Sequence, residues 1–107
     1  MSEADAAPNP WRGEAAFAVA GRRVVLRPTF AALVAAEEEL GPLFALVERA
    51  GAGQLRLAEI AALFWHCLAD RGDIDRKALG EALIAQGLAA ATAPLRTLLS
   101  QILQGRG

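Results

Sequence analysis

The sequence predicts an α+β fold, in which an N-terminal two-stranded antiparallel β-hairpin is followed by a bundle of four to five short α-helices. Two observations predict it. Apolar residues recur with a period of two between residues 14 and 27, and with a period near 3.6 in the segments that follow. Glycine and proline residues divide those later segments into short lengths. With 107 residues, of which 54% are hydrophobic, we expect a flexible arm over residues 1–11 and a single α+β domain over residues 12–107.

The hairpin is predicted at residues 14–27. Phe17 alternates with small neighbours, Gly21 supplies the turn, and Val24 and Leu26 share one face of the second strand. Because an isolated two-stranded hairpin is only marginally stable in water, we expect Phe17, Val24 and Leu26 to be buried against the helices. The outer edge of the hairpin is expected to stay open to a partner.

Five helices are predicted, at residues 30–40, 43–50, 55–70, 75–86 and 93–104. Thr29 is placed to cap the first of them and Gly41 to end it. Asp73 or Asp75 is expected to cap the fourth helix, and Gly87 to end it. The third helix has an apolar stripe so wide that we expect it at the centre of the bundle.

The C-terminal segment contains Pro94, which leaves two alternatives. Either one long helix is kinked at Pro94, or a new helix begins there, capped by Thr92 and with Pro94 in its first turn. We favour the second alternative. The apolar stripe of this segment follows helical spacing and consists of Leu95, Leu98, Leu99, Ile102 and Leu103. We expect this helix to be partly exposed or self-associating, and its stripe to contact a partner.

Charge and cysteine content exclude several classes of function. The formal net charge is −1, so the chain has no general attraction for nucleic acid or for anionic lipid. The single cysteine, Cys67, cannot form an internal disulfide, and a reducing cytoplasm is therefore the expected location. The first eleven residues lack the apolar region of a signal peptide, and no apolar stretch reaches the roughly 20 residues that a bilayer requires. We expect no membrane partner.

The polar side chains do not predict a reaction. His66 and Cys67 are neighbours in sequence, and adjacent residues on a helix point about 100° apart, so they do not form a nucleophile and its base. The acidic residues around position 73 match only half of a calcium loop and are better explained as helix caps. We therefore expect no catalytic, cofactor-binding or metal-binding residues, and a protein that is not an enzyme.

Three arginines, Arg22, Arg23 and Arg27, are grouped on the hairpin. They could meet phosphate groups, but the chain lacks aromatic residues interleaved with them for base stacking. Alternatively, they protect an exposed strand edge or pair with Glu14 and with the acidic run at residues 37–39. Glu37 falls on the apolar side of its helix, so we expect it to be half-buried and to contact Arg23 or Arg27, or to be held for the basic group of a partner.

The N-terminal arm carries one large aromatic residue, Trp11. We expect it to fold against the hairpin as a small lid, or else to anchor a partner.

The first third of the chain resembles a known family. The residues that carry the resemblance are the segment 9–14 (NPWRGE), the segment 26–33 (LRPTFAAL) and the acidic run 37–41 (EEELG), in this order around a short hairpin. They are similar to the opening of a family of tail assembly proteins from gene transfer agents and siphophages, described as tail assembly chaperones and also labelled as tail tube proteins. The later helices agree with that family in order and length, so the resemblance spans roughly residues 9–107.

The resemblance implies a tail assembly chaperone that binds the tape measure protein, keeps it soluble and helps to bring tail tube subunits to it. The alternative is a structural tail tube component of a phage or gene transfer agent particle, and a third interpretation is a small DNA-binding regulator. The expected partners are the tape measure protein and tail tube subunits, with self-association left open.

Overall fold

The computed structural model describes residues 14–104 and has the α+β architecture predicted from the sequence. The antiparallel strands β1 (Ala15–Val19) and β2 (Arg22–Leu26) form a two-stranded sheet in which Phe17 pairs with Val24. Ala20 and Gly21 make the turn, and both have positive φ, as a two-residue hairpin loop of this hand requires. The arm 1–11, with Trp11, lies outside the described residues.

The inner face of the hairpin is buried, as predicted. Phe17, Val24 and Leu26 are all buried, and the Phe17 ring meets that of Phe64 edge to face, with centroids 5.4 Å apart. The edge prediction was partly wrong. Arg27 N donates to the Cys67 carbonyl at 2.5 Å and Ala69 N donates to the Val25 carbonyl at 2.9 Å, so residues 67–69 close the C-terminal end of the β2 edge.

Five helices follow the hairpin: α2 (Phe30–Leu40), α3 (Leu43–Gly51), α4 (Leu57–Cys67), α5 (Arg76–Gln86) and α6 (Leu88–Gln104). The predicted caps are present, because the Thr29 side chain accepts from Ala32 N and the Asp75 side chain from Ala78 N. Gly41 and Gly87 end their helices with positive φ.

The predicted span 55–70 was too long at both ends. α4 is capped by Arg56, whose backbone N–H donates to the Glu59 side chain, and it ends at Cys67. It ends there because the next residues leave the helix to pair with β2, where Leu68 bridges Leu26. A tertiary backbone contact thus replaces the last helical turn.

The prediction of a new helix at residues 93–104 was wrong. α6 is one helix that begins at Leu88 and contains Pro94 in its interior. The alanine-rich stretch before the proline is a strong helix former, and Pro94 is itself buried, so burial of its ring offsets the backbone hydrogen bond that it cannot donate.

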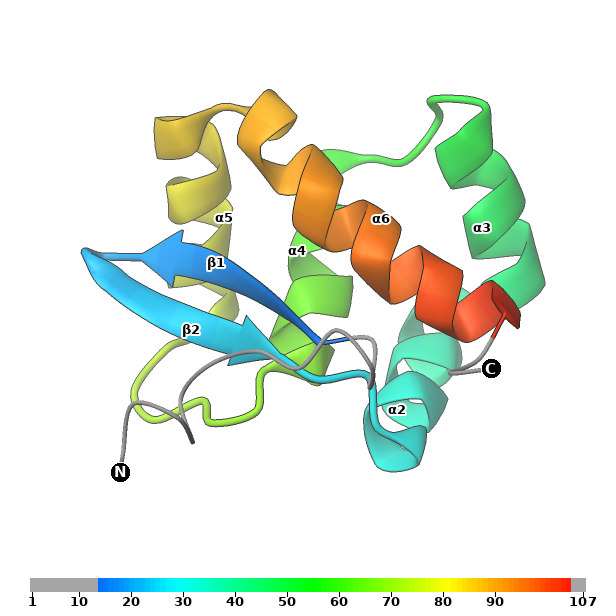
Figure 1. The fold of residues 1–107 in the computed structure, drawn as a ribbon, viewed down its shortest axis with the longest axis horizontal. Helices are drawn as coiled ribbons and strands as arrows, with labels where there is room; N and C mark the ends of the chain where they lie inside the picture. Colours follow the sequence, from blue (N-terminus) through cyan, green and yellow to red (C-terminus); the bar gives the residue numbers. More distant parts are fainter. Residues whose placement is uncertain (1–13, 105–107) are drawn as a thin grey trace.

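The core lies around α4, which packs between α2 and α5, while α6 contacts β1 and α5 and runs on beside α3 (Figure 1). Leu63, Phe64 and Cys67 on α4 are fully buried, which confirms its central position. Within residues 14–104 no single helix is long and apolar enough to cross a membrane, although α5 and α6, bent by 119° at Gly87, meet that test of length and composition as a pair.

Candidate functional site

The arginines of the hairpin mostly have acidic partners. Arg27 Nε lies 2.5 Å from Glu14 Oε2, and Arg22 Nη2 lies 3.3 Å from Asp73 Oδ1 on the facing loop. The Glu14 pairing is one of the two expected alternatives. Arg23 is exposed and makes no ion pair within residues 14–104.

Arg22, Arg23 and Arg27 line a groove of about 420 Å³ between β2 and the loop at residues 69–74. Asp70 lines the same groove, and Asp73 faces Arg22 across it. Because most of the positive charge is compensated locally, this groove has little long-range attraction for phosphate groups.

Glu37 is not half-buried and does not contact Arg23 or Arg27, so that expectation was wrong, while binding to the basic group of a partner stays a prediction. Its side chain is exposed, and its Oε2 accepts from Leu43 N at 3.1 Å, so it caps the start of α3 and contacts neither Arg23 nor Arg27. The neighbouring carboxylate that makes the long-range contact is Glu39. The reason is that Glu39 faces α4 and α5, which sequence periodicity within α2 cannot show.

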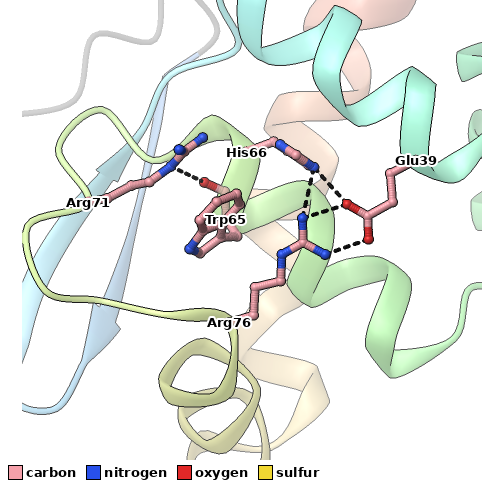
Figure 2. Close-up of polar contacts among 5 residues, drawn as sticks. All are labelled: Glu39, Trp65, His66, Arg71 and Arg76. Carbon is pink, nitrogen blue, oxygen red and sulfur yellow. Dashed lines mark hydrogen bonds and ion pairs between the residues drawn. The ribbon is translucent and has the colours of Figure 1, made fainter.

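Glu39 belongs to a polar cluster that joins α2, α4 and α5 (Figure 2). Arg76 donates from both terminal nitrogens to the two Glu39 oxygens, each at 2.5 Å, and His66 Nε2 lies 2.9 Å from Glu39 Oε1. This bidentate pair, with help from the imidazole, lowers the pKa of Glu39 to about 2 and raises that of Arg76.

Trp65 completes the cluster by lying between two guanidinium groups. Arg71 stacks 3.8 Å from the ring centroid and Arg76 lies 4.7 Å from it, while Trp65 Nε1 donates to the Ile74 carbonyl at 3.4 Å. Figure 2 shows Arg71 on one side of Trp65 and the Glu39–Arg76 pair on the other. Most polar atoms of this cluster hold three helices and a loop together, and within residues 14–104 the only buried side-chain nitrogen or oxygen that lacks a hydrogen-bond partner is Nδ1 of His66, so we assign the cluster a structural role.

His66 and Cys67 point in different directions. The Cys67 thiol is fully buried, and desolvation raises its pKa to about 12, which makes it a poor nucleophile. His66 is turned toward Glu39. Within the described part of the chain, no group of three or more His, Cys, Asp or Glu side chains is placed to hold a metal ion.

A continuous apolar region of the described surface lies between α3 and α6. Two hollows of about 360 and 220 Å³ share Val47 and Leu103, so they form one continuous face. We call it the α3–α6 face. Its apolar members are Leu43, Phe44, Val47, Ala50, Leu95, Leu99, Ile102 and Leu103.

The predicted C-terminal stripe is divided between this face and the core. Leu98 is fully buried, Leu95, Leu99 and Ile102 are half-buried, and Leu103 is 51% exposed. The stripe is therefore partly exposed, although partner binding by its residues stays a prediction. Sequence reasoning missed the contribution of α3, where Phe44 is 74% exposed. A phenylalanine at helical spacing is normally assigned to the core, and only the packing of α6 against α3 shows otherwise.

Two further apolar groups are exposed. Phe30 and Val34 lie one turn apart on α2, and Phe30 is 86% exposed. Ile84 and Leu88 lie at the other end of the molecule, on α5 and at the start of α6.

A family model described as "Phage tail tube protein, GTA-gp10" matches residues 12–105. The match covers nearly all of the chain, so the chain belongs to this family, and it is a phage or gene transfer agent tail component. This confirms the resemblance seen in the first third of the sequence. The description agrees with a structural tail component more than with a tail assembly chaperone. Searches of curated proteins and of solved structures found no match.

Proposed function

We propose that this tail protein is a structural subunit of the tail tube, which enters the particle through protein–protein contacts and catalyses no reaction. Its synthesis and first contacts would take place in the bacterial cytoplasm while particles are being assembled. The family description supports the tail assignment, and the distribution of apolar side chains supports a role in binding other proteins.

The observation that carries this proposal is the α3–α6 face. A small protein normally buries side chains such as Phe44 and Leu103, and their exposure side by side is typical of a protein-binding site. The Glu39 carboxylate, in contrast, is already paired within the chain, because it is shared between Arg76 and His66.

Mass spectrometry of purified, tailed particles tests the proposal. A structural subunit should be present in mature particles in a fixed ratio to the other tail proteins. The proposal would be abandoned if the chain were abundant in producing cells and absent from particles that carry complete tails.

A second function, as a chaperone of the tape measure protein, is favoured by the shape of the same face. The hollows between α3 and α6 form a groove with few polar groups, and such grooves accept the apolar side of an amphipathic helix. Co-expression with a tape measure protein distinguishes the two functions. A chaperone increases the soluble yield of the tape measure protein and forms a complex with it, whereas a tube subunit does neither.

A further inference from the structure

We propose that the α3–α6 face binds a second copy of this chain across a two-fold axis, forming a closed dimer before the tail is assembled. Only the role given to the dimer in tail assembly rests on the proposed function. Whether the dimer forms can be tested on the purified chain alone. The apolar residues of the face drive the association. Two charged residues at its rim, Glu48 and Arg96, indicate that the partner is a second copy of this chain.

The two charged residues stand on opposite sides of the groove. Arg96 on α6 lines the same hollow as Val47 and Gly51 of α3. Glu48 lies one turn after Phe44 on α3, which places it on the border of the face. Both side chains are exposed, and within residues 14–104 neither makes an ion pair. The carboxylate of Glu37, which also borders the face, is already occupied by Leu43 N.

The rim of the face carries one acidic and one basic side chain, Glu48 and Arg96, so its charges are complementary to those of a second copy of the same face. In an isologous contact the same patch meets itself, so each group must find its opposite on that patch. A two-fold axis that runs along the groove places α3 of one copy over α6 of the other. Glu48 then faces Arg96 of the second copy, and Arg96 faces Glu48 of the second copy. A strongly acidic or basic partner would leave one of the two groups facing a like charge.

The dimer has a consequence for assembly. An isologous contact closes with two copies, whereas a tube grows through contacts that stay open at both ends. A closed dimer therefore covers the α3–α6 face of free subunits and keeps them from associating early. Tail partners must displace the second copy before the face becomes available.

The oligomeric state of the full chain tests the proposal, measured by size-exclusion chromatography with light scattering over a series of concentrations. We expect the purified chain to be a dimer at about 100 μM, and the Leu103→Asp variant to be a monomer. The matched control is Ile84→Asp, which changes a similarly exposed apolar side chain outside the face and should remain dimeric. Circular dichroism verifies that both variants are folded.

Charge reversal tests the pairing itself. Glu48→Arg and Arg96→Glu should each raise the dimer dissociation constant about tenfold, because each brings like charges together at two symmetric positions. The double variant should return to within about threefold of the original value, since it restores opposite charges.

Three results would overturn the proposal: a monomer at about 100 μM, a ring or open polymer in place of a dimer, or a double variant whose dimer dissociation constant is as high as that of the single variants. The proposed tail function is tested separately, by the chain's presence in purified particles, and a ring or open polymer would contradict the dimer while still agreeing with a tube subunit.

Discussion

Helices α4 and α6 are both rich in apolar residues, but the molecule uses them differently. Six of the eleven residues of α4 are buried, against three of the seventeen of α6. α4 contacts helices on both sides, whereas α6 contacts β1 and lies beside α3, with one side of its C-terminal half unpartnered within the described residues. The difference indicates that α4 holds the fold together and that α6 offers surface to another protein.

The largest expected effect comes from α4. Phe64→Ala removes a fully buried ring that contacts Phe17, so we expect the free energy of unfolding to fall by about 3–5 kcal/mol. Urea denaturation followed by circular dichroism measures the change. The matched control is Phe44→Ala on the α3–α6 face, for which we expect a loss below about 1 kcal/mol. Equal losses for the two variants would show that the α3–α6 face is part of the core.

A smaller contrast is expected within α6 itself. Leu98 is fully buried and Leu103 is 51% exposed, so Leu98→Ala should cost about 2–4 kcal/mol and Leu103→Ala less than about 1 kcal/mol. Chemical denaturation of dilute protein, below the concentration at which it associates, makes the comparison. If Leu103→Ala proved as costly as Leu98→Ala, the division of α6 into a core side and a binding side would be wrong.

The smallest effect concerns the cluster that attaches α2 to α4 and α5. The folded pKa of Glu39 is about 2, below its ordinary value of 4.5, so its contribution to stability is fully present above pH 4.5 and is lost as the pH falls toward 2. Because both partners are partly exposed, we expect Glu39→Gln to cost no more than about 1 kcal/mol at pH 7.

The pH dependence of this loss distinguishes the ion pair from a packing effect. Thermal unfolding of Glu39→Gln and of the original chain should converge as the pH approaches 2. Glu38→Gln is the matched control, since Glu38 is exposed next to Glu39 and should change stability little at any pH. A difference for Glu39→Gln that is independent of pH would contradict the assignment.

Local signals in the sequence predicted much of the fold. Thr29 and Asp75 cap the helices expected of them, and Gly41 and Gly87 end theirs, because caps depend on only a few neighbouring residues. The buried face of the hairpin followed from its period of two in the same way.

The errors have tertiary causes. Leu68 leaves α4 because it pairs with β2, far away in sequence, and Pro94 is accepted inside α6 because its ring is buried. Glu39 was not singled out because its partner Arg76 is 37 residues away. Only the α6 half of the α3–α6 face was predicted from the sequence. The periodicity of α6 shows which of its residues form an apolar stripe, but it cannot show that Phe44 of α3 lies beside that stripe.

The central claim is that the α3–α6 face serves assembly and not stability. Its most direct test is to restore a strain that lacks this gene with either Leu103→Asp or Ile84→Asp, and to count tailed particles by electron microscopy. We predict that Ile84→Asp restores normal numbers and that Leu103→Asp, although folded and expressed at the same level, does not. Full restoration by Leu103→Asp would contradict the account.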